Sequence, residues 1–372
     1  MDPKHEKRAK PDDLGPVVVR IPQEPVEAAM EADAVDAIHT QDVVVRGPLF
    51  GVAAQDAADG PRWRVVASVR ASFAQEARDS LNSLLWFRAK DDTEDRAQRR
   101  TLLAAVTRLE NERVDELTVL GTRYRIVRAE EYAGTGPEGI EQPRPTDPEP
   151  VIPDWTRTSR GRALDADLIL DPAAPLTPAQ AMERLILRTM AYSGSQYPAD
   201  VLHDSHRATI THPDVLLLPT TFLAVERTST GWKRASDLHA SAHDARKTLD
   251  NRLTHWQPRL RGLIPLHAPP DTDAHSLVAA GTATPGSELA AYAAASHRLR
   301  AGRINQIKVH NTLYRIARAR RLLRWGPDGP EGPRPSDTDD HDPEPIHPTM
   351  DEHGTIHYAD DGDDDEADSD DD

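Results

Sequence analysis

The feature that most limits the fold of this sequence is a segment that recurs 190 positions later in the same register. Between residues 122–147 and 312–337, 14 of 26 aligned positions are identical. A chain of 372 residues also exceeds the usual size of one compact core. We therefore expect a tandem duplication of one α+β unit, with the two copies packed as a pseudo-dimer about an approximate twofold axis.

Each copy is predicted to contain a helix, a small antiparallel meander, one or two further helices and a closing β-hairpin. The first copy spans residues 16–133. Its expected elements are a strand at 17–21, a helix from Pro25 with Val26, Met30, Ala34 and Ala37 on one face, strands at 42–46, 49–54 and 62–69, a helix capped by Ser72 and Gln75, a second helix from about Thr93, and hairpin strands at 116–120 and 122–129.

The second copy, residues 163–325, repeats this order. Thr177, Pro178 and Gln180 predict a capped helix that corresponds to the Pro25 helix. Its expected buried stripe comprises Met182, Leu185, Ile186 and Met190. A later helical stripe runs from Leu238 to Trp256, and a Pro-rich insertion at 258–285 precedes a helix at 288–301.

Pro- and Gly-rich segments follow both hairpins and end in the same Asp-Pro-Glu-Pro motif. Residues 134–162 are expected to link the copies, and residues 326–372 to form a Pro-rich arm and an acidic, disordered tail. Residues 1–15 are expected to be disordered. Residues 336–372 hold 17 acidic residues and no Lys or Arg, so the rest of the chain balances at 45 acidic and 45 basic residues.

The composition excludes several classes of protein. The chain has no cysteine, which excludes disulfides and thiol chemistry and fits a reducing compartment. No apolar run reaches membrane-spanning length, and the charged N-terminus is unlike a secretory signal. We therefore expect a cytoplasmic protein without membrane contact.

Two sets of side chains are candidate sites. His239 and His243 are four residues apart on an expected helix, with Asp244 beside them, so all three could face one divalent metal; the alternative is two ordinary half-exposed histidines. The second hairpin is rich in basic residues where the first has Glu130 and Glu131, and could bind an anion or nucleic acid, with the acidic tail as a competitor. The basic set is Lys308, Arg315, Arg318, Arg320, Arg321 and Arg324. Its alternative interpretation is the solvated side of the hairpin.

Three segments resemble an uncharacterised actinobacterial family that carries a domain-of-unknown-function label. They begin at Asp42 (DVVVRGPLFG), Arg78 (RDSLNSLLWFRAK) and Glu116 (ELTVLGTRYR). Members are sometimes labelled PE-PGRS proteins, a name that 20 glycines in 372 residues do not support. The resemblance implies no activity, cofactor or catalytic residue.

The sequence contains no nucleophile elbow, and the Gly134-Thr-Gly136 stretch is followed by prolines that forbid the helix of a nucleotide-binding loop. The hypothesis that fits best is a non-enzymatic interaction or regulatory protein with a protein partner and no cofactor. Nucleic-acid binding through the second hairpin and a metal-dependent enzyme with its site in the second copy are the alternatives.

Overall fold

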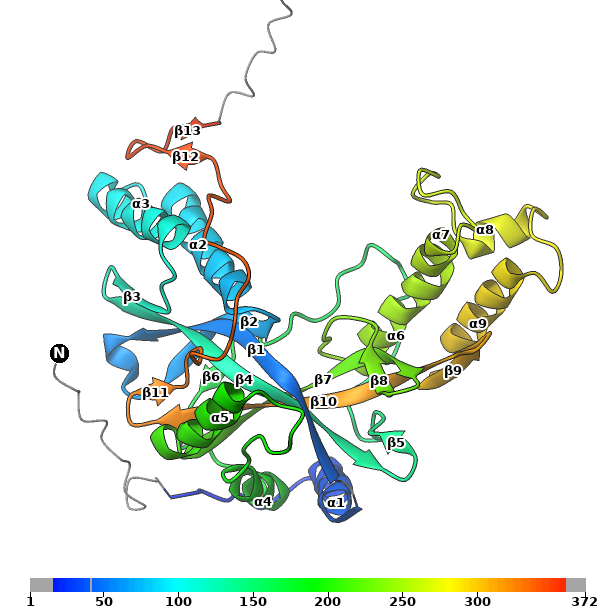
Figure 1. Ribbon diagram of the computed structural model, residues 1–372, viewed down its shortest axis with the longest axis horizontal. Helices are drawn as coiled ribbons and strands as arrows, with labels where there is room; N and C mark the ends of the chain where they lie inside the picture. Colours follow the sequence, from blue (N-terminus) through cyan, green and yellow to red (C-terminus); the bar gives the residue numbers. More distant parts are fainter. Residues whose placement is uncertain (1–15, 41, 359–372) are drawn as a thin grey trace, which may run out of the picture.

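The computed structural model describes residues 16–40 and 42–358 (Figure 1). The first half forms, in order, α1 (Pro25–Thr40), β1 (Asp42–Asp56), a short 3-10 helix (Ala57–Asp59), β2 (Trp63–Ala71), α2 (Ala74–Asp91), α3 (Arg96–Asn111), β3 (Glu116–Val119), β4 (Thr122–Gly136) and β5 (Gly139–Ile140). The mixed α+β class predicted from the sequence is confirmed. The expected disordered segments at 1–15 and 359–372 lie outside the described residues.

The second half continues from residue 169 and contains more helices than the first. Its elements are β6 (Ile169–Leu170), α4 (Pro178–Leu187), α5 (Ala199–Thr211), β7 (Asp214–Thr228), β8 (Gly231–Arg234), α6 (Ala242–Asn251), the π-helical segment η3 (Arg252–Trp256), α7 (Gln257–Leu260), α8 (Ala274–Ala279), α9 (Glu288–Gly302), β9 (Gln306–Val309), β10 (Thr312–Gly326), β11 (Gly329–Pro330), β12 (Thr349–Met350) and β13 (Ile356–His357). Within the described ranges, no helix is both long and apolar enough to cross a bilayer.

Strands of both halves join in one sheet of 11 strands, in which the path β6-β2-β1-β4-β10-β7-β8 is continuous. The halves meet where β4 pairs antiparallel with β10, and Glu131 lies opposite Arg321. These two residues occupy the same position of the 190-residue repeat. The two flanking pairs are Glu130 with Leu322 and Tyr132 with Arg320, and the 190-residue offset converts one pair into the other. The register therefore places an approximate twofold axis through the Glu131–Arg321 pair.

The Pro-rich segments that follow β4 and β10 cross to the opposite half. In Figure 1, β5 lies beside the strands of the second half and β11 beside those of the first. The backbone amide of Arg128 donates to the carbonyl of Glu331, and that of Arg318 to the carbonyl of Glu141, both at 2.9 Å. These two hydrogen bonds are counterparts at the same offset. Each half thus holds the arm of the other.

Side chains shared by both copies hold the tips of these arms. Arg125 donates to the carbonyls of Asp328 and Pro330, at 2.9 and 3.0 Å. Arg315, its counterpart, donates to the carbonyls of Glu138 and Ile140, at 2.7 and 3.1 Å. The guanidinium groups also stack over indole rings, Arg125 over that of Trp63 and Arg315 over that of Trp232.

Glycine is required at both arm tips. Gly139 and Gly329 have positive φ angles of 97° and 103°. A Cβ atom on Gly139 would lie 3.0 Å from Nε1 of Trp232, and one on Gly329 would lie 2.8 Å from Nε1 of Trp63. The repeated glycines therefore serve close packing of an arm on an indole ring.

The main apolar core follows from this arrangement. One cluster combines residues of β1, β2 and β4 with residues of β7 and β10, so both halves share it. Two further clusters lie outside it: α2 and α3 cover the first half, and α6, η3 and α9 cover the second. Figure 1 shows these helical layers on opposite sides of the molecule, with the β4–β10 junction between them.

One predicted helix start is wrong and another is confirmed. α2 begins at Ala74 after Phe73, which offers no capping side chain, so the expected cap by Ser72 is wrong. The capping box of Thr177 and Gln180 on α4 is confirmed. The helix directly before β7 is α5, so α5, rather than α4, occupies the place that α1 has before β1.

Candidate functional site

The six basic residues of the second hairpin do not form a solvated row. Only Lys308 is exposed. Arg321 is fully buried and makes a bidentate ion pair with Asp165, at 2.6 and 2.7 Å. Arg324 is 1% exposed and donates to backbone carbonyls, including that of Met190. The expectation of a solvated hairpin side is therefore corrected, because these guanidinium groups lie in the core of the sheet.

The remaining arginines of that set meet carboxylates as well. Arg318 pairs with Asp147 at 3.1 Å, and Arg320 pairs with Glu183 and with Glu141. Arg315 holds the arm tip described above. To reach these arginines, a nucleic-acid phosphate would have to displace their buried carboxylate partners. The free energy lost in breaking such buried ion pairs exceeds the free energy gained from a surface phosphate contact.

The first half has an equivalent buried charge cluster. Glu130 accepts from Arg128 and Arg334 and from the hydroxyl of Tyr192. Burial alone would raise the pKa of Glu130, but the two guanidinium groups outweigh it and hold that pKa below its usual value. Glu130 is therefore a charged structural partner of the crossed arm, which supplies Arg334.

The metal candidates are not assembled as predicted. His239 precedes α6 and pairs through its backbone with Phe222, whereas His243 lies on α6, buried, with its Nε2 3.0 Å from the carbonyl of Asp154. Asp244 accepts a hydrogen bond from the hydroxyl of Ser241, which caps α6. No group of three or more metal-ligating side chains comes together in the parts of the chain that the structure describes.

His203, Asp204 and His206 lie together on α5. The carboxylate of Asp204 accepts from the amide of Ser336 at 2.8 Å, so this residue anchors the second crossed arm. The charged carboxylate of Asp204 therefore stabilises a backbone amide of the arm.

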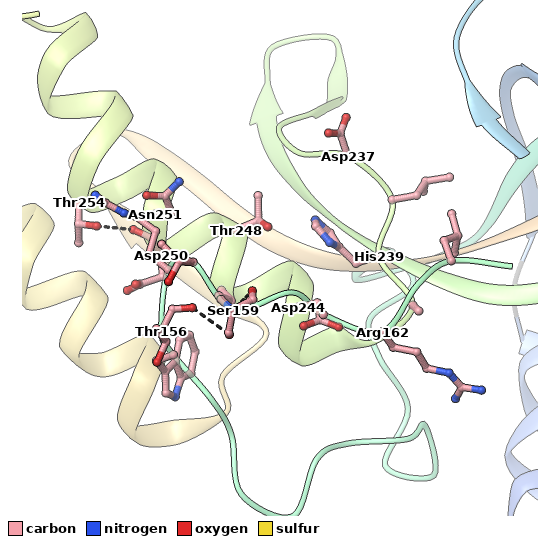
Figure 2. A pocket seen from close by; sticks show the side chains of 18 of the residues that line it. Thr156, Ser159, Arg162, Asp237, His239, Asp244, Thr248, Asp250, Asn251 and Thr254 are labelled. Carbon is pink, nitrogen blue, oxygen red and sulfur yellow. Dashed lines mark hydrogen bonds between the residues drawn. The ribbon is translucent and has the colours of Figure 1, made fainter. Parts of the chain in front are cut away.

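A cavity of about 680 Å³ lies beside His239 (Figure 2). Its walls are α6, the loop 237–240 and a segment at 155–164, which we name the strap. Lys247 on α6 donates to the carbonyl of Ser159 on the strap at 2.7 Å. Gly161 passes so close to Asp244 that a Cβ atom there would lie 2.5 Å from the carboxylate. These contacts fix the strap against α6 and keep the cavity open beside it.

Two polar atoms of the cavity lining are buried without a hydrogen-bond partner. They are Nε2 of His239 and Oδ1 of Asn251. Burial lowers the pKa of His239, opposed by Asp244 and Asp237, so its ring is neutral near pH 7. Neither atom has accessible surface, so both lie behind the cavity wall.

A serine, an aspartate and a histidine also meet next to this cavity, but their geometry is unlike that of a nucleophilic triad. The hydroxyl of Ser296 donates to Asp250, and Nε2 of His275 lies 2.7 Å from the same hydroxyl. Ser296 is fully buried, and Asp250 is ion-paired with Arg300 at 2.6 Å. The carboxylate of Asp250 therefore accepts directly from the serine, whereas in a nucleophilic triad the histidine lies between the two. The network joins α6, α8 and α9.

An apolar surface lies at the junction of α1, α4 and the start of β1. The sequence predicts that Met182, Leu185 and Ile186 face the core, but they are 40%, 51% and 53% exposed. α4 buries Ala179, Ala181, Arg184 and Leu187 in their place. The predicted stripe is wrong because Arg184 turns inward to form a buried ion pair with Asp214 at 2.6 Å.

Exposed apolar side chains also occur on α1 and at the start of β1. Val26 and Met30, expected on the inner face of α1, are 70% and 43% exposed. Val43 and Val44 of β1 are 45% and 49% exposed, whereas their counterparts on β7, Val215 and Leu216, are 0% and 8% exposed. We name the set the α1–α4 surface, and it comprises Val26, Met30, Val43, Val44, Met182, Leu185 and Ile186.

The first half of β1 has one open edge. Residues 42–49 pair with β4 on one side, but β2 pairs only with residues 50–54. No other backbone hydrogen bond reaches residues 42–49 from the described part of the chain. Open backbone groups beside Val43 and Val44 can accept a further strand.

The fold and these sites define an α+β protein with two similar halves, exchanged arms and an uncovered apolar surface. The chain belongs to a family of unknown function, DUF5954, whose model matches residues 24–340. The match spans both halves and both arms. No curated protein and no solved structure matches the chain.

Proposed function

We propose that this chain is a non-enzymatic, cytoplasmic interaction protein that binds an extended segment of a partner protein along the open edge of β1. The observation that carries the proposal is the exposure of the α1–α4 surface. Apolar side chains that the helical periodicity would bury are left uncovered beside unpaired backbone groups. Large exposed apolar patches of this kind commonly mark protein-binding sites.

The chemistry of the surface limits the partner. Main-chain hydrogen bonds to the open groups of residues 42–46 would hold the added strand, and side chains on one of its faces would rest on Ile186 and Val43. A hollow of about 100 Å³ lined by Ile38, Val43 and Ile186 gives room for one aliphatic side chain. α1 carries four acidic residues and no Lys or Arg. The partner segment is therefore apolar and β-branched, with basic residues at the end that faces α1.

Selection from a displayed library of random peptides tests this proposal without knowledge of the natural partner. The full chain should select apolar, β-branched peptides with flanking Lys or Arg. Replacement of Val43 by Pro removes an open backbone amide, because Val43 lies opposite Gly134, whose carbonyl points away from β1 to the amide of Glu141, and it should abolish the selection. The matched control is Val151→Lys, which alters an apolar residue that is 90% exposed and far in sequence from β1. Failure to enrich any such motif, or equal enrichment on Val43→Pro, rejects the edge as the binding site.

We also infer that the two units, residues 16–133 and 163–325, descend from one duplicated unit. The support is the 190-residue offset, which relates both the sequence identities and the contacts of the crossed arms. A single-copy chain of residues 16–162 should form a dimer with exchanged arms if this inference is correct. A folded monomer would contradict it.

A further inference from the structure

Residues 17–21, which lead into α1, form a second exposed apolar stretch of extended chain (Figure 1). Their sequence is VVVRI, and we name them the pre-α1 segment. Val18, Val19 and Ile21 are 45%, 50% and 72% exposed. Among the described residues, the only backbone pairing of this segment is a parallel bridge between Val19 and Leu176. Its apolar side chains are therefore left uncovered, as are those at the start of β1.

One edge of the pre-α1 segment is open. The carbonyl of Val18 and the amide of Arg20 bond to the backbone of Leu176, at 2.9 and 2.8 Å. Backbone groups of successive residues in an extended chain point to opposite sides. The amide and carbonyl of Val19 therefore point away from Leu176, and no backbone hydrogen bond reaches them from the described part of the chain. These groups can pair with the edge of another strand.

The pre-α1 segment has the chemistry that the edge of β1 requires. Residues 17–20 are VVVR, the same four residues as 43–46, so pairing brings β-branched side chains together across the strands. Arg20 supplies positive charge, and Lys10 precedes the segment in the sequence. Arg20 already pairs with Glu27 of its own α1 at 3.0 Å. Its charge therefore suits the acidic residues of that helix.

The pre-α1 segment of the same chain lies at the wrong end of α4 to fill this edge. Leu176, which holds the segment, comes directly before α4. Ile186 and Leu187, at the other end of α4, line the hollow beside Val43. α4 has 10 residues and is therefore about 15 Å long. A segment held at Leu176 thus lies about one helix length from the edge of its own β1, a limit that a second molecule does not meet.

We propose that the segment bound by β1 is the pre-α1 segment of a second copy of this chain, and that two copies exchange these segments. The inference rests on the proposed function, because it names the partner for the same edge. The open groups of Val19 in each copy pair with residues 43–45 of the other. The contact is made twice about a twofold axis, which is the commonest symmetry of homodimers. The α1–α4 surface of each copy is then covered by the other.

Sedimentation equilibrium of the full chain over a range of protein concentrations tests the proposal. The wild type should form a dimer that dissociates on dilution. Val19→Pro removes the open amide of the pre-α1 segment and should raise the dissociation constant of the dimer by about tenfold or more, because a hydrogen bond is lost at both contacts. Val18→Pro is the matched control. The amide of Val18 lies on the side of Leu176, so this variant should dimerise as the wild type does.

A mixture of two variants separates a lost contact from a lost fold. Val43→Pro closes the receiving edge but keeps a pre-α1 segment, whereas Val19→Pro keeps the edge and loses the segment. Neither should dimerise alone, and together they should form a heterodimer through the one intact contact. A wild type that stays monomeric at every concentration overturns the proposal. Dimerisation of Val19→Pro equal to that of the wild type, or a mixture that does not associate, also overturns it.

Failure of this inference is distinguishable from failure of the proposed function. Val19→Pro leaves β1 unchanged, so peptide selection on this variant should enrich the same motif as selection on the wild type. A monomeric wild type that still selects apolar, β-branched peptides would reject the pre-α1 segment as the occupant and leave the open edge as a binding site. A monomeric wild type that selects no such peptide would reject both.

Discussion

Glu131 and Arg321 lie directly opposite each other at the centre of the sheet, although they occupy the same position of the repeat. Each has its own partner: Glu131 pairs with Arg46 at 3.1 Å and Arg321 with Asp165 at 2.6 Å. A residue on a twofold axis faces its own counterpart. Identical charges there would repel across the strands, so the change of sign has a structural cause.

Removal of the guanidinium group of Arg321 should be strongly destabilising. Arg321→Ala leaves Asp165 buried and unpaired, and we expect the free energy of unfolding to fall by about 3–5 kcal/mol. Arg108→Ala, in an exposed pair with Glu112, should cost less than about 0.5 kcal/mol. Chemical denaturation of the three proteins measures both values. Similar losses for the two variants would contradict the buried role of Arg321.

The crossed arms predict a measurable coupling between the halves. Arg128 and Asp337 are paired at 2.7 Å and belong to opposite copies. A double-mutant cycle of Arg128→Met and Asp337→Asn should give a coupling energy of about 0.5–3 kcal/mol in chemical denaturation. Additive effects would show that the second arm does not rest on the first half.

The arm-tip glycines predict a steric effect beyond backbone strain. Gly139→Ala and Gly329→Ala should each lower the free energy of unfolding more than Gly60→Ala does. All three have positive φ, but a Cβ atom on Gly60 would meet nothing within 4 Å. Backbone strain alone is worth about 1 kcal/mol. Equal losses at the three positions would exclude contact between the arm tips and the indole rings.

Buried histidines predict a pH dependence of stability. Burial lowers the pKa of His212 and of His239 below the ordinary value of about 6.5. The unfolded chain then takes up protons more readily than the folded chain as the pH falls below that value, so stability is lost on that side and retained above it. His239→Gln should flatten the decline between about pH 6.5 and 5, and His203→Gln, with an exposed side chain, should not.

The α+β class could be predicted from the sequence because apolar alternation and turn residues are local signals. Arg125 and Arg315 occupy the same position of the 190-residue repeat. The carbonyl groups that they bind lie more than 170 positions away, on the arm of the other half. Local patterns do not reveal such crossed contacts, although the shared Pro-Gly segments were the available signal.

The candidate sites show the same limit. The basic hairpin looked solvated because the pairing of β4 with β10, which places it at the centre of the sheet, has no local signature. Asp165 lies just after the expected linker with no motif around it, and was missed. The apolar stripe of α4 was expected to face the core, and its exposure follows from the inward turn of Arg184 toward Asp214.

The central functional claim concerns the uncovered α1–α4 surface, and quantitative capture from native lysate tests it most directly. Three baits are the wild-type chain, the double variant Val44→Lys with Ile186→Lys, and the control Val151→Lys. A fourth bait ends at Tyr358 and tests the contribution of residues 359–372. This truncation keeps Asp337, which pairs with Arg128. We predict at least one protein retained equally by the wild type and the control, and lost from the double variant. Retention of the same proteins by all baits, or of none by the wild type, would contradict the account.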